Sequence, residues 1–401
     1  MEINIEKSKY SLQSKEELAL LKRQFQQNII GIPKDNNPEE SRVPLTPEGV
    51  ETLVKLGYKI LIENEAGLKA GYTNNDYIKS GAKITYDKNE IFQNASIIIK
   101  VGPLTRRELE ALNKNRIIIS ALNLTTQRKE NFEILMAKKT TAIAYEYYTD
   151  EDGFNPFLQV IGEIIGSMSI MIAAELLSNS TETGKGIMLG GITGVPPANV
   201  VIFGTDISAR QAIRTALGLG ANVKVFEKSI KKLSEIRHIF GNHIYTSTIN
   251  TIEIEKALKE ADVLINSMKR SPNETFIITE EMVKQMPHYS IIIDLKIDAG
   301  TIIETSRITS FKEPYYIKHN ILHYCIPNLA SKIPMTTSIA LNNVLVPILR
   351  RIYEVGGFEM YIRINKSLRN STYIYKGVLT NEDISKLFSL RSTSIEFFFD
   401  L

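Results

Sequence analysis

A glycine turn between two short β-branched segments is the part of this 401-residue sequence best suited to bind a nucleotide. Residues 199–203 predict a strand that leads into Gly204, and residues 223–226 predict a second strand that ends on Glu227. The apolar residues between the two strands recur at helical spacing. In a dinucleotide-binding βαβ unit, such a turn receives the pyrophosphate, and a carboxylate about twenty residues further on binds the ribose hydroxyls. The pattern therefore indicates a Rossmann unit with Glu227 at the ribose.

The turn departs from the dinucleotide fingerprint at its second position. Where G-x-G-x-x-G calls for glycine, the chain has Gly204, Asp206 and Ala209. Alanine at the third position is ordinary, because that residue only sets the packing of helix on strand. A carboxylate at the second position adds bulk and negative charge where the two phosphates would lie. The turn alone leaves two interpretations open: a dinucleotide site, and a Rossmann-like domain that binds a dinucleotide poorly or not at all.

Four polar residues at the ends of predicted strands are the candidates for substrate chemistry. They are Arg42, Lys100, Asn123 and Asp298. In open α/β sheets, ligands bind outside the carboxyl ends of the strands. Each of these residues also has a plain structural interpretation, as a surface arginine, a solvent-facing lysine or a turn residue.

The elements that would position these residues alternate between strand and helix. The alternation over residues 28–157 predicts a mostly parallel sheet with helices on both faces, and a second alternation follows a long apolar helix over residues 158–178. Another apolar helix, over residues 336–352, returns to the first domain. We therefore predict an α/β fold of two Rossmann-like, doubly wound domains, joined by two long helices with a cleft between them. The predicted division is an N-terminal arm at 1–27, a substrate domain at 28–157 plus 336–401, and a nucleotide-binding domain at 158–335 that includes the connector helix.

Composition narrows the class of protein. Hydrophobic residues make up 43% and charged residues 23% of the chain, which is typical of a soluble globular protein, and a net charge of +3 gives no electrostatic reason to expect a nucleic-acid partner. The single cysteine, Cys325, excludes an internal disulfide and a cysteine-based metal site, so we expect no metal. The charged N-terminal segment lacks the apolar core of a signal peptide, and no apolar run reaches the length of a membrane span. We therefore expect a cytoplasmic protein without a membrane partner.

The sequence resembles the alanine dehydrogenase family, whose fold is shared by the nucleotide-binding subunit of proton-translocating transhydrogenase. The similar segments follow the family's order and lie between residues 28 and 352. They are GIPKDNNPEESRVPLTPEGV, AGLKAGYTNNDY, IIIKVGPL, TAIAYE, GKGIMLGGITGVPPANVVIFG, DLKIDAGTIIETSRITS and HYCIPNLASKIP. The resemblance implies reversible, NAD-linked oxidative deamination of L-alanine to pyruvate and ammonia, with a small-molecule substrate and a homo-oligomer that is commonly a hexamer.

The resemblance assigns roles on the substrate side. Arg42 matches the arginine that clamps the substrate carboxylate, a task suited to a planar guanidinium. Lys100 matches the lysine that holds the substrate's carboxylate or carbonyl oxygen. Asp298 matches the aspartate near the nicotinamide and the substrate nitrogen, where a carboxylate can relay a proton. Asn328 matches an asparagine beside the nicotinamide.

The resemblance also assigns roles on the cofactor side. Gly204, Asp206 and Ala209 fall on the pyrophosphate turn, and Glu227 and Lys232 fall at the adenosine end. A carboxylate repels the 2′-phosphate of NADP, so Glu227 favours NAD.

Two departures from the family pattern bear on activity. Asn123 stands where the dehydrogenases of the family place the histidine that acts as general acid/base, and an amide does not titrate, so Asp298 or a bound water would have to carry the proton. His323 is the nearest histidine by motif. Gly162 stands where the family commonly offers a serine hydroxyl to the phosphates. The chain therefore lacks a phosphate contact at Gly162 as well as at Asp206.

A second hypothesis therefore stays open, a catalytically silent relative that acts as a ligand-binding or structural scaffold. A transhydrogenase-like subunit would need a membrane partner that nothing in the sequence reveals.

Overall fold

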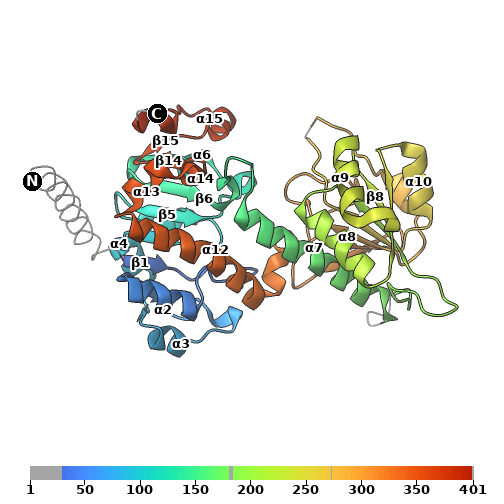
Figure 1. Cartoon of the computed structure of the whole chain (residues 1–401), viewed down its shortest axis with the longest axis horizontal. Coiled ribbons are helices and arrows are strands. Elements are labelled where there is room, and N and C mark those ends of the chain that lie inside the picture. Colours follow the sequence, from blue (N-terminus) through green and yellow to red (C-terminus); the bar gives the residue numbers. More distant parts are fainter. Residues whose placement is uncertain (1–28, 180–183, 272, 400–401) are drawn as a thin grey trace, which may run out of the picture. The chain divides into compact units, whose positions relative to one another are not determined.

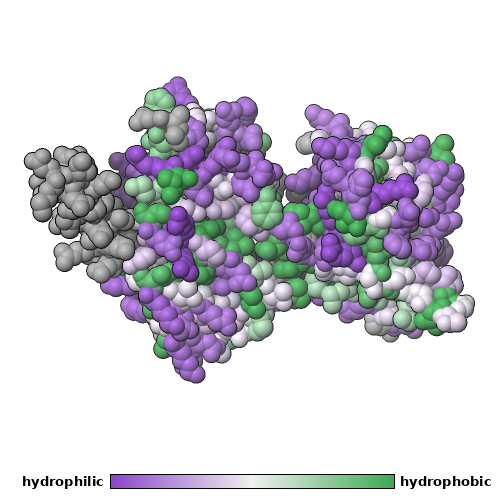
Figure 2. Space-filling view, viewed as in Figure 1, coloured by the Kyte–Doolittle hydropathy of each residue, from purple (hydrophilic) through white to green (hydrophobic). Residues whose placement is uncertain are grey.

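The computed structural model describes residues 29–179, 184–271 and 273–399 (Figure 1). The chain divides into two compact units, of which the first takes residues up to Leu158 and again from Ile333, and the second takes Gln159–Lys332. The arm predicted at 1–27 lies outside the described residues. Figure 2 shows that hydrophilic side chains cover much of the viewed surface of each unit.

The first unit is built on an eight-stranded sheet with the order β15-β14-β6-β5-β4-β1-β2-β3. Strands β1 to β6 pair in parallel. The chain order reverses between β1 and β4, so the carboxyl ends of these two strands mark the switch point at which sheets of this kind bind ligands. The strands are β1 (Ile29–Ile32), β2 (Lys59–Glu63), β3 (Lys83–Thr85), β4 (Ile97–Ile99), β5 (Ile117–Ser120), β6 (Thr141–Ala144), β14 (Thr372–Tyr375) and β15 (Val378–Leu379).

The C-terminal tail extends this sheet. Strand β14 pairs antiparallel with β6, and β15 pairs antiparallel with β14. Every residue of β14 is buried, which ties the tail to the core of the first unit. The helices of the first unit are α2 (Pro47–Leu56), α3 (Asn74–Lys79), α4 (Lys88–Asn94), α5 (Arg106–Ala111), α6 (Lys129–Ala137), α12 (Pro334–Glu354), α13 (Phe358–Ile364), α14 (Lys366–Ser371) and α15 (Glu382–Phe388).

Close packing of α2 on α12 fixes the loop that follows β1. The Thr46 side chain caps α2 by accepting a hydrogen bond from the Gly49 amide. A Cβ on Gly49 would lie 1.8 Å from Asn342 Oδ1 on α12, so only glycine permits this approach. The Val43 amide donates to Ser338 Oγ, also on α12, at 2.9 Å. The residue after Arg42 is therefore anchored to a long helix.

The second unit is built on a seven-stranded sheet with the order β12-β13-β11-β10-β7-β8-β9. All pairs are parallel except β12 with β13, and the chain order reverses between β7 and β10. Helix α8 packs on β7 and β8, and α9 packs on β9. The elements are β7 (Asn199–Phe203), β8 (Asn222–Phe226), β9 (Ile244–Ser247), β10 (Val263–Asn266), β11 (Ile291–Asp294), β12 (Tyr315–Lys318), β13 (Ile321–Tyr324), α8 (Ile207–Gly218), α9 (Ile230–Phe240), α10 (Thr251–Lys259) and α11 (Glu280–Lys284). The two doubly wound sheets confirm the predicted fold class, while the cleft between the domains stays a prediction.

Helix α7 (Pro156–Leu177) begins in the first unit and continues into the second. Among the described residues it is the one helix that is long and apolar enough to cross a membrane by length and composition, so the expectation that no apolar run reaches that length is wrong for this helix. Half of its most apolar stretch is buried, as in core helices of globular proteins, so its length and composition are weak evidence for a span.

Candidate functional site

The glycine turn of the second unit lies at the carboxyl end of β7, at the switch point of its sheet. Gly204 has a φ of +105°, and a Cβ at this position would lie 3.0 Å from the Ser267 carbonyl carbon, so both backbone conformation and space require glycine. The Phe203 and Phe226 rings stack beneath the turn with centroids 5.0 Å apart, and the Gly204 amide donates to the Phe226 carbonyl. An aromatic pair of this kind contributes about 0.5–1.5 kcal/mol beyond its burial. Phe203 and Phe226 are also register partners of β7 and β8, so Gly204 and Glu227 follow neighbouring strand ends.

Asp206 caps helix α8 with its own side chain. Its Oδ1 accepts hydrogen bonds from the Ala209 amide at 3.0 Å and from Ser267 Oγ at 2.5 Å. Its Oδ2 lies 2.8 Å from Lys296 Nζ. Burial raises the pKa of Asp206, but the Lys296 ammonium and these hydrogen bonds outweigh it and bring the pKa below its ordinary value. The carboxylate therefore stands ionised at a helix N-terminus, the position at which a Rossmann turn receives phosphate.

Glu227 follows β8 and is buried. Thr205 Oγ1 donates to its Oε2 at 2.9 Å, and the Lys228 and Ser229 amides donate to its Oε1. Lys232, the other residue expected at the adenosine end, lies in the first turn of α9 and is exposed. The structure thus holds the Glu227 carboxylate in a fixed orientation and leaves Lys232 on the surface of the same unit.

Asp298 lies in the turn after β11, and a buried carboxylate organises that turn. Asp294 Oδ1 accepts hydrogen bonds from Asn266 Nδ2 at 2.9 Å and from the Lys296 amide at 3.0 Å. Its Oδ2 accepts a short hydrogen bond from Thr301 Oγ1. Asp294 is therefore a residue that sequence reasoning missed, and its role is to order residues 295–301.

Asp298 itself is exposed, yet the surrounding chain withdraws water from its carboxylate and raises its pKa. Lys296 and Lys269 oppose this shift only in part. A carboxyl group with a raised pKa is suited to exchange a proton with a substrate.

Asn328, expected beside the nicotinamide, and His323, the nearest histidine by motif, have different surroundings. Asn328 lies in the turn between β13 and the short helix η6 (Leu329–Lys332), and its carbonyl accepts from the Ser331 amide. His323 is fully buried in β13, where it bonds to Thr305 Oγ1 at 2.8 Å and stacks on Tyr316. Desolvation lowers the pKa of His323 to about 4, so this histidine is a neutral core residue.

Arg42 lies in the loop after β1 and is 12% exposed. Its Nε and Nη2 donate to the two carboxylate oxygens of Glu40, at 2.7 and 2.6 Å. Glu40 is buried, so the guanidinium is held by a two-point charge-assisted contact. Glu40 is a partner of Arg42 that the sequence alone does not reveal.

Lys100 closes β4 at the switch point of the first sheet and is 1% exposed. Its Nζ donates to Glu108 Oε2 and to the Pro103 carbonyl, both at 3.0 Å, and lies 3.6 Å from Asp35 Oδ1. The other oxygen of Asp35 is buried with no hydrogen-bond partner among the described residues. Lys88 adds a second ion pair to Glu108, at 2.9 Å. The structure thus places Lys100 at the predicted strand end and surrounds its ammonium with internal acceptors.

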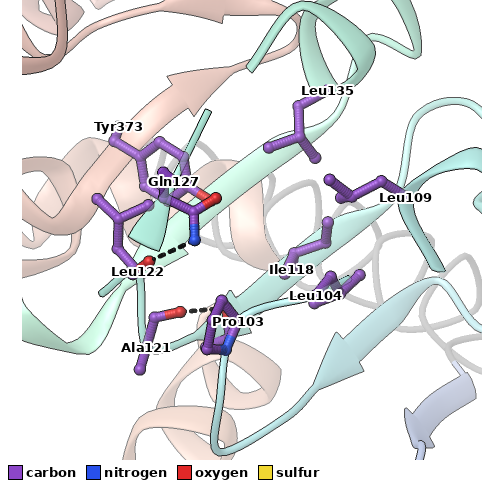
Figure 3. A pocket seen from close by; sticks show the side chains of 10 residues that line it. Pro103, Leu104, Leu109, Ile118, Ala121, Leu122, Gln127, Leu135 and Tyr373 are labelled. Carbon is purple, nitrogen blue, oxygen red and sulfur yellow. Dashed lines mark hydrogen bonds between the residues drawn. The ribbon is translucent and has the colours of Figure 1, made fainter. Parts of the chain in front are cut away.

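Asn123 follows β5 and is exposed, with a left-handed φ of +46°. The Glu146 carboxylate accepts hydrogen bonds from the Leu122 and Asn123 amides at 2.8 and 2.9 Å, which holds this turn. On its inner side the turn borders a small cavity of about 20 Å³, where Gln127 Nε2 donates to the Leu122 carbonyl (Figure 3). A cavity of that size accommodates about one water and no amino-acid substrate.

The candidate residues separate into two groups, one in each unit. Those of the first unit follow β1, β4 and β5, and those of the second follow β7, β8, β11 and β13. In each unit these strands are parallel, so their carboxyl ends meet at the same edge of the sheet. Among the described residues, no group of three or more His, Cys, Asp or Glu side chains could hold a metal ion.

The second unit provides part of what a dinucleotide requires. Gly204 makes the tight turn that a dinucleotide site uses, and Glu227 presents a buried carboxylate where a ribose would lie. Gly162 on α7 lies against α8, since a Cβ there would be 2.8 Å from Ile207 Cγ2, so its lack of a side chain serves packing. Asp206 occupies the phosphate end. The residues therefore fit the nucleoside part, and the fit at the pyrophosphate depends on the Asp206–Lys296 pair.

The strand order of both sheets, the glycine turn and the buried carboxylate after β8 are typical of a two-domain α/β protein of the nucleotide-binding dehydrogenase class. Two family models match, the alanine dehydrogenase/PNT N-terminal domain over residues 31–165 and the corresponding C-terminal domain over residues 169–382. The chain belongs to the alanine dehydrogenase/PNT family. Membership implies a nicotinamide cofactor and a small-molecule substrate.

Individual relatives agree with this assignment. The chain is 34% identical over 372 residues to alanine dehydrogenase of Staphylococcus haemolyticus and 36% identical over 373 residues to that of Methanococcus maripaludis, covering 92% of this chain and 98% of each relative. A solved L-alanine dehydrogenase superposes with a TM-score of 0.82 at 31% identity, over 90% of this chain and 99% of that one. A transhydrogenase from Sinorhizobium meliloti, with a TM-score of 0.73 at 19% identity over 89% of this chain and 100% of that one, shares the fold.

Proposed function

We propose that this protein catalyses the reversible oxidative deamination of L-alanine to pyruvate and ammonia with NAD. The observation that carries the proposal is the similarity to alanine dehydrogenases over 98% of their length, across both domains. The strand-end residues of both sheets support it, because they supply a carboxylate clamp, a lysine and a ribose carboxylate at ligand-binding edges.

Glu227 supports NAD as the form of the cofactor. Its carboxylate is held by Thr205 and two backbone amides, so it cannot turn away from a 2′-phosphate without losing these bonds. NADP would bring two negative charges to this point, and repulsion disfavours it. NAD supplies the hydride acceptor of the reaction.

The residues of this chain would handle the substrate as follows. Arg42 binds the substrate carboxylate through its guanidinium. Lys100 lies at the switch point. Its ammonium releases one of its internal acceptors and binds the substrate's carboxylate or carbonyl oxygen in its place. Asp298 takes and returns the proton, because Asn123 does not titrate and can only orient a water or a carbonyl. Asn328 borders the nicotinamide.

The test is a titration of the purified protein with NADH, followed by turnover assays with L-alanine and with pyruvate plus ammonia. Micromolar binding and turnover in both directions are the expected results. Absence of binding at millimolar NADH would contradict the proposal, since every dehydrogenase mechanism passes through that complex.

A catalytically silent scaffold is the second candidate function. The capped helix at Asp206, the sequestered Lys100 and the amide at Asn123 favour it. NADH binding without turnover would distinguish this candidate from the dehydrogenase.

We also propose a cytoplasmic homo-oligomer, with the hexamer common in the family as the expected size. Exposed apolar residues on the loop after α7, among them Met188, Ile192 and Val195, provide surface that a second copy could cover. Sedimentation equilibrium tests this expectation, and a monomer at micromolar concentration would contradict it.

A further inference from the structure

The pyrophosphate turn of the second unit carries an ion pair where a Rossmann turn carries a glycine. Asp206 follows β7 and Lys296 follows β11, and their charged atoms are 2.8 Å apart across the carboxyl end of β10. An anion that binds at this turn meets both charges, the negative one of Asp206 and the positive one of Lys296. The two side chains therefore act on it together.

Asp206 acts as an anion already bound at the helix N-terminus. The Ala209 amide, which would face a phosphate oxygen in a glycine turn, donates to Asp206 Oδ1 instead. Ser267 Oγ donates to the same oxygen. A cofactor phosphate that enters this site meets a carboxylate, and only a cation at the same place can offset the repulsion.

Lys296 is that cation, and its backbone is fixed. Its amide donates to the buried carboxylate of Asp294, which is itself held by Asn266. Its side chain is 19% exposed and that of Asp206 is 40% exposed, so solvent reaches the ion pair in part. A partly exposed ion pair contributes little to stability, so the ammonium can exchange one anion for another.

We propose that Lys296 is a phosphate ligand of the cofactor site in this chain. When the cofactor binds, its ammonium moves from Asp206 to the pyrophosphate. This contact takes the place of the close approach between backbone and phosphate that glycine at position 206 would allow. The inference rests on the proposed function, because it assumes that a dinucleotide binds. The competing role for Lys296 is that of a counter-ion that only neutralises Asp206.

A double-mutant comparison separates these two roles. NADH affinity is measured by calorimetry for the wild type, Asp206→Gly, Lys296→Met and the double variant. A phosphate ligand predicts that Lys296→Met weakens NADH binding about tenfold or more even in the Asp206→Gly background. Equal affinity of Asp206→Gly and the double variant would overturn the inference, because a pure counter-ion has no task once Asp206 is absent.

Three controls make the result specific. Lys296→Arg should retain most of the affinity, since it keeps the charge. Lys256→Met removes an exposed lysine of α10 that pairs with Glu253, and it should leave NADH affinity unchanged. Adenosine, which has no phosphate, should bind the wild type and Lys296→Met equally, and a loss of adenosine affinity would overturn the inference by showing that the substitution damages the site in general.

The outcome also separates this inference from the proposed function. Binding of NADH that ignores Lys296 refutes the inference and leaves the dehydrogenase intact. Failure of the wild type and of Asp206→Gly to bind NADH at all refutes both.

Discussion

The guanidinium of Arg42 makes a two-point contact with the carboxylate of Glu40, with Nε 2.7 Å from Oε1 and Nη2 2.6 Å from Oε2. The Glu40 carboxylate also accepts the Arg42 backbone amide at 3.0 Å. Arg42 is therefore oriented before a substrate arrives, which reduces the ordering that binding requires. Glu40 is a positioning residue in this interpretation, and Arg42 is the group that touches the substrate.

Arg42→Lys tests the clamp. An ammonium cannot make two parallel N–H···O bonds, so we expect the KM for pyruvate to rise about tenfold to a hundredfold. Glu40→Gln keeps the shape of the partner and removes its charge, and we expect a smaller rise in KM with little change in kcat. Steady-state kinetics measure both. A lower KM in Glu40→Gln would show that Glu40 competes with the substrate for Arg42.

Asn123→His tests the missing acid/base. The position has a left-handed φ, which histidine accepts more readily than most residues, so the variant should fold. An imidazole titrates near pH 6.5 and can carry the proton, so kcat near neutral pH should increase by up to about a hundredfold. The measurement is kcat against pH, with Asn123→Gln as the control that cannot titrate. A flat response would mean that another group already transfers the proton efficiently.

Asp298→Asn tests the proposed proton carrier. Because desolvation raises the pKa of Asp298, the wild-type rate should increase with pH through an apparent pKa above the ordinary value of about 3.9. We expect the asparagine variant to lose about a hundredfold or more in kcat and this pH dependence with it. Calorimetry should show NADH binding that is little changed. A variant with the wild-type pH profile would exclude Asp298 as the carrier.

Glu108 is predicted to stabilise the first unit through Lys100. Burial alone would raise the pKa of Glu108, but the Lys100 and Lys88 ammonium groups and a backbone amide bring it below its ordinary value. A lowered folded-state pKa means that this stabilisation is complete above the unfolded value of about 4.3 and is lost as the pH falls through the folded value.

Lys100→Met should cost about 3–5 kcal/mol in the free energy of unfolding, since it leaves a buried carboxylate with one partner fewer. Glu108→Gln should show a weaker loss of stability between neutral and acid pH than the wild type. Urea unfolding at a series of pH values measures both effects. Equal acid sensitivity of Glu108→Gln and the wild type would contradict the linkage.

The sequence predicted the elements whose signal is local. Strand β7 has the predicted bounds, and β8 begins one residue earlier than expected. Asp206 was recognised as a departure, and its residue type also suits the N-cap position that it takes before α8. The residue type of Asp206 therefore indicates both an altered phosphate site and the start of helix α8.

The features that escaped prediction depend on contacts between distant residues. Strands β14 and β15 form because β6 offers a free edge, which the tail sequence does not reveal. Glu40 and Asp294 look like loop carboxylates until the fold buries them. Lys296 lies two residues beyond β11, and its proximity to Asp206 follows only from the strand order of the sheet.

NAD-linked turnover of L-alanine is the central claim, and its most direct measurement is the formation of NADH and pyruvate by the purified protein. We predict that L-alanine with NAD yields the two products in equal amounts, and that NADP replaces NAD poorly because of Glu227. Arg42→Lys serves as the matched weak variant. A folded protein that binds NADH and forms neither product would contradict the claim and establish the silent scaffold instead.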